Sequence, residues 1–221
     1  MPPHPSSSSG RSRSRSRGRA SRDLRFAGRI AGFGTTSGTR IVLGLWETSP
    51  FGRFADAMIE DARGHRILLA PTDEVAAFIA ATYAFDEVRV LPVARRRIDG
   101  GLALDASALS VRLRVGPVSP LGRVLRSVPP RLATHPGWLR AIDPVARTLQ
   151  PGVRTAGSAG GGRREFYGVT LARRIVWAEA RLDGADLGAF AELDPPVRFG
   201  FASAPREPHL VDVVTTIREP R

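Results

Sequence analysis

Apolar and polar side chains alternate in short segments along most of the chain after residue 23. In 24–32 (LRFAGRIAG), Leu24, Phe26 and Ile30 recur at every second position, and after the turn cluster GFGTTSGT a second such segment spans 39–48. A period of two is typical of a β-strand with one buried face, and two strands around a tight turn predict a hairpin. This pattern constrains the chain to a fold built mainly from β-sheet.

The same pattern recurs towards the C-terminus. Further strands are predicted at 54–61, 65–70, 85–93, 102–104, 109–115, 167–182, 197–202 and 210–218. Because most neighbours are joined as hairpins, we expect an antiparallel sheet, curled or partly closed into a barrel. The predicted fold class is therefore α+β or mainly β.

Two regions carry helix signals instead. Thr72 is a good N-cap, and the acidic residues Asp73 and Glu74 suit the positive end of a helix dipole, which predicts one helix over 72–84. Residues 119–149 contain two start signals, Ser119-Pro120 and Asp143-Pro144. This insert is predicted to form short helices, punctuated by prolines, that cover one end or face of the sheet.

The N-terminal residues 1–22 differ from the rest in composition. They hold six arginines and no acid, whereas the remainder holds 27 arginines against 21 acids, so half of the net charge of +12 lies in the tail. A segment this poor in apolar residues cannot bury enough surface to fold. We expect a disordered Arg/Ser-rich tail at 1–22 and a single globular domain at 23–221. The tail either binds nucleic acid as a polycation or is translated sequence upstream of the true start.

Missing residue types exclude several chemistries. The chain has no cysteine, no lysine and no asparagine. Disulfides, finger-type zinc sites, thiol nucleophiles, Schiff-base lysines and phosphate-loop lysines are therefore excluded. Arginine in place of lysine indicates a high-GC bacterial genome. No apolar run is long enough for a transmembrane helix or a secretory signal, which predicts a cytoplasmic protein without membrane association.

The glycine-rich stretch 157–168 (GSAGGGRREFYG) is the best candidate for a binding site. Successive backbone N–H groups and arginine forks hold phosphate or carboxylate in many proteins. The stretch matches neither common phosphate-loop template, so a flexible surface loop remains the alternative. The residues predicted to bind a small anion are Arg154, Gly160, Gly161, Gly162, Arg163, Arg164 and Tyr167.

Signals for catalysis are weaker. The histidines His4, His65, His135 and His209 share no metal-ligand spacing, so no metal or other cofactor is predicted. His135 or His209 can still act as a general base. An acid–base pair is also conceivable among four carboxylates. These carboxylates are Glu47, Asp56, Glu60 and Glu165.

Four sequence blocks resemble uncharacterised conserved (hypothetical) proteins of high-GC actinobacteria: RFAGRIAGFGTTSGTRIVLG, ILLAPTDEVAAFIAATYAFDEV, PGVRTAGSAGGGRREFYG and DPPVRFGFAS. The likeness covers most of the chain from Leu24 onward and implies a source but no known activity. A curled sheet is also analogous to the fold of enzymes that resemble acetoacetate decarboxylase. That family's catalysis needs a lysine, which this chain lacks, so the analogy implies no activity.

These sequence features are compatible with three functions. The first is a domain that binds a small anionic ligand near the glycine-rich, arginine-bearing loop. The second is a nucleic-acid-associated protein that acts through residues 1–22. The third is an enzyme with a carboxylate or histidine site.

Overall fold

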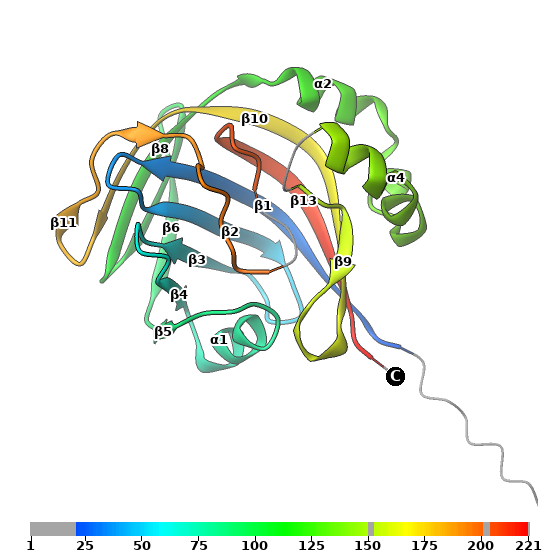
Figure 1. The fold of residues 1–221 in the computed structure, drawn as a ribbon, viewed down its shortest axis with the longest axis horizontal. Helices are drawn as coiled ribbons and strands as arrows, with labels where there is room; N and C mark the ends of the chain where they lie inside the picture. Colours follow the sequence, from blue (N-terminus) through cyan, green and yellow to red (C-terminus); the bar gives the residue numbers. More distant parts are fainter. Residues whose placement is uncertain (1–20, 150–152, 201–203, 221) are drawn as a thin grey trace, which may run out of the picture.

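The fold was analysed in a computed structural model that describes residues 21–149, 153–200 and 204–220. A curled sheet dominates it, with the strand order β5-β4-β3-β2-β1-β13-β10-β8-β7-β6 (Figure 1). The short strands β9 and β11 pair with β10, and β12 pairs with β1. Few and short helices accompany the sheet. This confirms the predicted fold class, a mainly β or α+β chain with a curled antiparallel sheet.

The strands are β1 (Asp23–Thr35), β2 (Arg40–Thr48), β3 (Phe54–Glu60), β4 (Arg66–Ala70), β5 (Glu87–Val90), β6 (Val93–Ile98), β7 (Gly101–Ala106), β8 (Leu109–Val118), β9 (Ala156–Ser158), β10 (Arg164–Leu182), β11 (Ala185–Asp186), β12 (Phe190–Ala191) and β13 (His209–Arg218).

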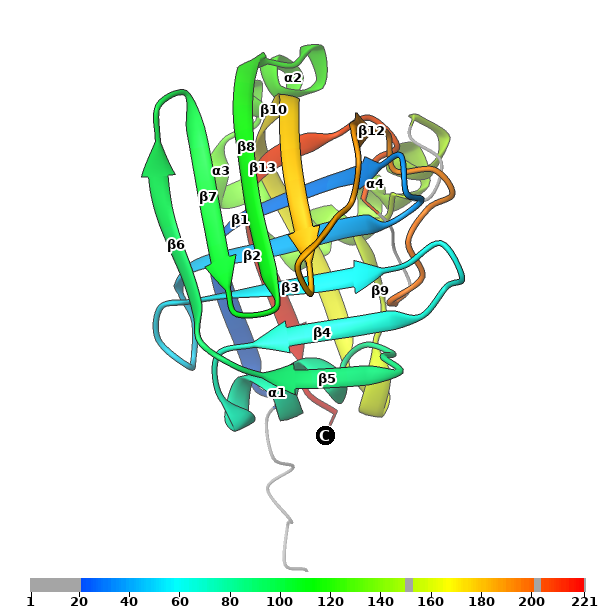
Figure 2. The same cartoon turned by 90° about the vertical axis from the view of Figure 1, so that its left-hand side faces the viewer.

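The sheet has two arms that cross. The first arm comprises β1 to β5, in which only β4 and β5 run parallel. The second arm comprises β6, β7, β8 and the C-terminal part of β10. Figure 2 shows the second arm standing upright in front of the strands of the first arm. Crossing sheets of this kind bury the facing side chains of both arms.

The main core lies between the arms. Its fully buried side chains include Phe33 and Leu43 from the first arm and Leu104 and Leu113 from the second. Burying an aliphatic or aromatic side chain of this size contributes about 1.5–3 kcal/mol. The alternating pattern of the sequence therefore reflects strands with one face on this core.

Helix α1 (Asp73–Ala80) connects β4 to β5 and covers the opposite face of the first arm. The Thr72 hydroxyl accepts a hydrogen bond from the Val75 amide, as predicted for the N-cap. Its apolar face packs Val75 and Ile79 near Phe26. The helix ends at Ala80, a few residues earlier than predicted.

The insert forms α2 (Pro120–Ser127), α3 (Pro130–Ala133) and α4 (Pro136–Leu149) over the outer side of β10 (Figure 1). Short helices here were predicted, but the start at Asp143-Pro144 was wrong. Helix α4 begins at Pro136 and contains Pro144 in its interior. The reason is tertiary, because the Asp143 carboxylate accepts hydrogen bonds from the backbone of the segment leading into β9 and does not cap a helix.

Three other predictions differ from the structure. The predicted strand 85–93 is divided into β5 and β6 at Pro92. Residues 197–200 are not a strand, while 201 and 202 lie outside the described residues. The glycine-rich loop is shorter than predicted, because β10 already begins at Arg164 and a single 3-10 turn, η1 (Gly160–Gly162), precedes it.

Candidate functional site

A pocket of about 360 Å³ lies where α4, β9 and the start of β10 meet. We call it the arginine pocket, and its lining residues are Arg140, Asp143, Arg147, Arg154, Ala156, Gly157, Ser158 and Arg164. Four guanidinium groups thus surround one carboxylate. Of the residues predicted to bind an anion, Arg154 and Arg164 line this pocket.

One buried carboxylate anchors the pocket. Asp143 on α4 accepts hydrogen bonds from the Thr155 amide at 2.7 Å and the Ala156 amide at 3.1 Å, and Arg147 lies one helical turn away with its Nε 2.8 Å from Oδ2. Burial opposes ionisation, but these backbone hydrogen bonds and the Arg147 guanidinium hold the pKa of Asp143 below its ordinary value. The carboxylate therefore stays charged and fixes α4 against β9.

Residues of β10 alternate between two environments. Arg164 and Phe166 face α4, and the ring of Phe166 is fully buried. The guanidinium carbons of Arg140 and Arg218 lie 5.7 Å and 5.6 Å from the centroid of that ring. Contacts at this distance are typical of cation–π interactions. The arginine pocket therefore borders an apolar centre that holds α4 in place.

The glycine run has a different contact. Gly160 donates its amide to the Thr82 carbonyl at 3.0 Å, and an added Cβ at Gly160 would lie 2.4 Å from the Ala81 carbonyl oxygen. Gly161 and Gly162 have positive φ angles of 65° and 73°, a region that favours glycine. Gly160 and Gly161 lie against the C-terminal end of α1, Gly162 lies near Pro220, and none of the three lines the arginine pocket.

Arg163 also binds the end of α1. Its Nη1 donates to the Thr82 hydroxyl at 2.9 Å, and its guanidinium carbon lies 4.7 Å from the centroid of the Phe78 ring. A cation at a helix C-terminus is favoured by the helix dipole. Arg163 therefore stabilises the end of α1, on the other side of the strand from Arg164.

Tyr167 belongs to a buried hydrogen-bonded cluster on that same side. The Tyr83 hydroxyl donates to Glu165 and lies 2.8 Å from the Tyr167 hydroxyl. Burial raises the pKa of Glu165 to about 7. Burial and the neighbouring carboxyl raise the pKa values of both tyrosines well above their usual range, so both hydroxyls remain protonated.

The other three carboxylates considered for acid–base chemistry have separate partners. Asp56 is buried, accepts a hydrogen bond from the Trp46 indole at 2.9 Å, and has its pKa raised by burial to about 7. Glu60 forms a buried ion pair with Arg40 at 3.3 Å. Glu47 binds Arg95 at 3.0 Å and Arg53 at 3.3 Å near the surface. In the described part of the chain, each of the four carboxylates considered thus contacts its own set of residues.

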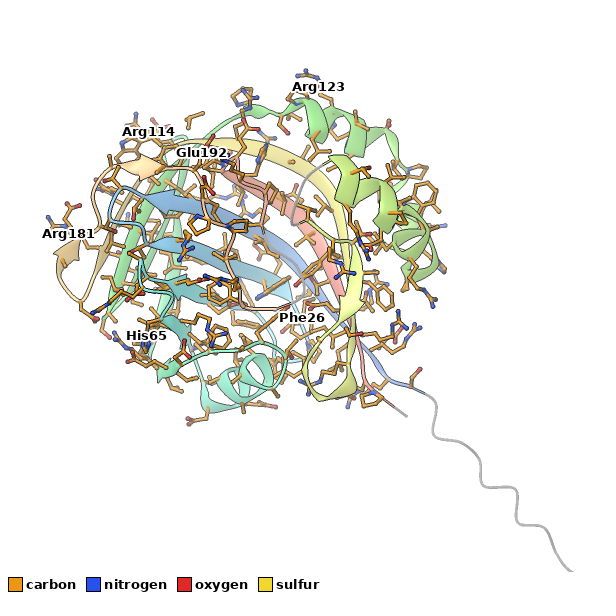
Figure 3. All side chains as sticks on the ribbon, viewed as in Figure 1. Phe26, His65, Arg114, Arg123, Arg181 and Glu192 are labelled. Atoms are coloured by element: carbon orange, nitrogen blue, oxygen red, sulfur yellow. The ribbon has the colours of Figure 1, made fainter. Side chains whose placement is uncertain are left out.

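The histidines lie apart from one another. His65 lies at the periphery near β5, as Figure 3 shows. Its Nε2 lies 3.3 Å from the carboxylate of Glu87. The ring of His135 accepts the Gly137 amide at 3.1 Å, and the Nδ1 of buried His209 lies 2.7 Å from the Glu207 carbonyl. His4 is outside the described residues. Within the described ranges, no three His, Asp or Glu side chains are grouped to hold a metal ion.

The proposed nucleic-acid-binding tail, 1–22, lies outside the described residues except for Ser21 and Arg22. Of the helices in the described segments, none has the length and apolar character required to span a bilayer.

Sequence reasoning found part of the arginine pocket and missed the rest. Arg154 and Arg164 flank the glycines, which marks them in the sequence as candidates for anion binding. Arg140 and Arg147 come from α4, at a spacing of seven residues that places both on one helix face. That spacing was visible in the sequence, but the prediction of a helix start at Asp143 separated the two arginines.

Comparisons with known proteins were made for the whole chain. No protein-family model and no curated protein matches it. Among solved structures, the crystal structure of acetoacetate decarboxylase from Legionella pneumophila is similar over 89% of this chain and 84% of that one, with 9% sequence identity and a TM-score of 0.42. At this identity and TM-score, the likeness carries no argument about the activity of this chain.

Proposed function

We propose that this protein binds a small hydrophilic anion, such as a phosphate or a polycarboxylate, in the arginine pocket. The observation that supports this most is the charge of the lining, where four arginines face one carboxylate. Asp143 is already bound by backbone amides and by Arg147, and among the described residues Arg140 and Arg164 form no ion pair within 4.0 Å.

The shape and chemistry of the lining favour this ligand class. Guanidinium forks bind carboxylate and phosphate oxygens in pairs, which makes arginine the preferred residue for such ligands. Ala156 is the one apolar lining residue among those described, so little apolar surface is offered to a ligand. A volume of about 360 Å³ lies in the lower part of the range of about 300–1,000 Å³ typical of small-molecule sites.

The glycine run has an indirect role in this proposal. Gly160 and Arg163 attach the segment before β10 to the end of α1. This attachment fixes the position from which Arg164 projects into the arginine pocket. Replacing Arg163 is therefore expected to lower stability and to leave the number of anion contacts unchanged.

The test is a thermal-shift experiment on the full chain at matched ionic strength, with inorganic phosphate, pyrophosphate and citrate as probes. A bound anion at a hundredfold excess over its Kd stabilises the folded state by about 2.7 kcal/mol. We expect at least one of the three probes to raise Tm, and we expect Arg140→Ala/Arg164→Ala to remove that rise.

The matched control is Arg126→Ala on α2, which removes the same kind of charge from an exposed position outside the arginine pocket. It should keep the full rise in Tm. The proposal is wrong if no probe raises Tm, or if Arg126→Ala reduces the rise as much as a single substitution in the arginine pocket does.

A further inference from the structure

The three helices of the insert form a layer on the outer side of β10, and Figure 1 shows them following the curve of the sheet. They lie in a row along this one strand. Phe166 contacts α4, Gly168 lies against the end of α3, and Ala172 lies against α2. We call this surface, residues 119–149, the insert layer.

The insert layer is strongly basic, with five arginines and one acidic residue. The acidic residue, Asp143, is buried and bound by Arg147 and by backbone amides. The other four arginines are exposed and form no ion pair within 4.0 Å with any described residue; they are Arg123, Arg126, Arg131 and Arg140. Figure 3 shows Arg123 at the outer edge of the molecule. Exposed cations without counter-charges attract an anionic surface.

Each helix of the insert layer also exposes an aliphatic side chain. Val124 on α2 is 64% exposed, Leu132 on α3 is 42% exposed, and Val145 on α4 is 56% exposed. An arginine directly precedes Val124 and Leu132, and another follows Val145 by two residues. Aliphatic side chains beside cations on exposed helices are typical of segments that lie in the interface of a membrane.

Two other kinds of partner fit this surface less well. A nucleic-acid backbone accounts for the arginines but leaves the aliphatic side chains exposed to water. A protein interface usually has an apolar centre with charge at its rim, whereas here arginines stand beside separate aliphatic side chains. A lipid headgroup region accepts separate side chains, because each lipid molecule adjusts its own position.

From this arrangement we propose that the insert layer docks on the surface of a bilayer that contains anionic phospholipids. The arginines contact lipid phosphates, and Val124, Leu132 and Val145 enter the boundary between headgroups and acyl chains. The sequence prediction of no membrane association depended on the lack of a spanning segment, and docking on the surface requires none. The inference does not depend on an anion in the arginine pocket.

The test measures co-sedimentation of the full chain with vesicles of phosphatidylcholine and phosphatidylglycerol, and with vesicles of phosphatidylcholine alone. We expect binding to the anionic vesicles only, and we expect added salt to weaken it. Val124→Ser/Leu132→Ser/Val145→Ser should weaken this binding about tenfold, because less apolar surface enters the bilayer.

A second variant measures the contribution of charge. Removal of three arginines should weaken binding to the anionic vesicles about a hundredfold, at about fivefold per charge, in Arg123→Ala/Arg126→Ala/Arg131→Ala. Arg140 is kept, because it also lines the arginine pocket. Both triple variants should keep the anion-dependent rise in Tm, so failure of this proposal and failure of the anion site are distinguishable.

The matched control is Val88→Ser/Val90→Ser on β5, where the two valines are 44% and 45% exposed outside the insert layer. It should bind the anionic vesicles as the parent chain does. The arginines of residues 1–22 are the same in all variants, so their attraction to the vesicles does not change. Unchanged vesicle binding in the triple serine variant, or an equal loss in the control, overturns the proposal. Tighter binding to duplex DNA than to anionic vesicles, unaffected by the serine substitutions, would assign the insert layer to nucleic acid instead.

Discussion

Two basic pockets, the arginine pocket and a seam pocket between the two arms, are alike in size and charge but differ in how they are built. The seam pocket is lined by Arg29, Leu45, Glu47, Arg53, Arg95, Arg96, Arg97 and Leu102. The volumes of the two pockets are about 360 and 370 Å³, and arginines dominate both linings. The arginine pocket is lined by residues between 140 and 164, which are near one another in sequence. The seam pocket is lined by strands from opposite arms. Similar charge therefore arises in two ways, from neighbours along one segment in the arginine pocket and from the meeting of two arms in the seam pocket.

Each pocket is also backed by a buried carboxyl on the opposite face of its strands. Glu165 follows Arg164 on β10, and Asp56 on β3 is the register partner of Gly44, which precedes Leu45. Burial raises the pKa of each carboxyl to about 7. A substitution can change a pocket residue without changing the buried carboxyl behind it, or the reverse. The contribution of each to stability can therefore be measured separately.

The largest expected effect concerns stability against pH. Glu165 has a folded-state pKa of about 7 and an ordinary value of 4.5, so the folded state binds the extra proton between these values. The contribution of Glu165 to the free energy of unfolding should therefore be fully present below about pH 4.5 and fall by about 3 kcal/mol as pH rises to about 7. Denaturant unfolding of Glu165→Gln should lack this part of the decline, and Asp56→Asn should lack the part due to its own carboxyl. An unchanged pH slope in both variants would contradict the raised pKa values.

The next largest effect should come from the anchor of the arginine pocket. Asp143→Asn removes the charge that Arg147 and two backbone amides bind. Breaking a buried, hydrogen-bonded charge should lower the free energy of unfolding by about 2 kcal/mol and abolish the anion-dependent rise in Tm. A full anion-dependent rise in Tm in this variant would show that Asp143 is not needed to hold the arginine pocket in its binding shape.

A smaller effect is expected from Arg163→Ala. The variant loses a hydrogen bond to Thr82 and the contact with the Phe78 ring, which together should cost about 1 kcal/mol. Chemical denaturation measures this loss, and calorimetry should find anion affinity within twofold of the parent chain. A tenfold loss of affinity at unchanged stability would instead place Arg163 in contact with the anion.

The smallest effect is expected at the rim of the seam pocket. Glu47→Gln removes ion pairs with Arg53 and Arg95 at a half-exposed carboxylate, and exposed pairs contribute about 0–1 kcal/mol. Stability should change by less than about 1 kcal/mol. Chemical denaturation measures this change, and a loss above about 2 kcal/mol would mean that the contact between Glu47 and Arg95 holds the two arms together.

Local patterns predicted most of the fold. The alternation in 24–32 and the N-cap at Thr72 depend on neighbours in sequence, and both predictions are confirmed by β1 and α1. Asp143-Pro144 has the same local form as a helix start, but the side chain of Asp143 is used by residues of a later segment. Tertiary contacts outweighed local preference at that position.

The two pockets differ in how far the sequence could predict them. Arg154 and Arg164 flank a visible glycine run, so a pocket near them was a natural expectation. The run Arg95–Arg97 was equally visible, but nothing local indicates that Arg29 approaches it from another arm. Such an approach depends on strand order and on the curl of the sheet, which a single sequence does not specify.

Strand β10 connects the two arms of the sheet through its pairing with several other strands. Its 19 residues pair with β8, β9, β11 and β13, and register shifts near Val169 and Ile175 let it bend from one arm into the other. Under force, β10 and its neighbour β13 thus carry the load between the two arms. A chain cut within β10 would lose both arms together, and heating should release them in one cooperative transition, so a ligand in either pocket would raise the same melting temperature.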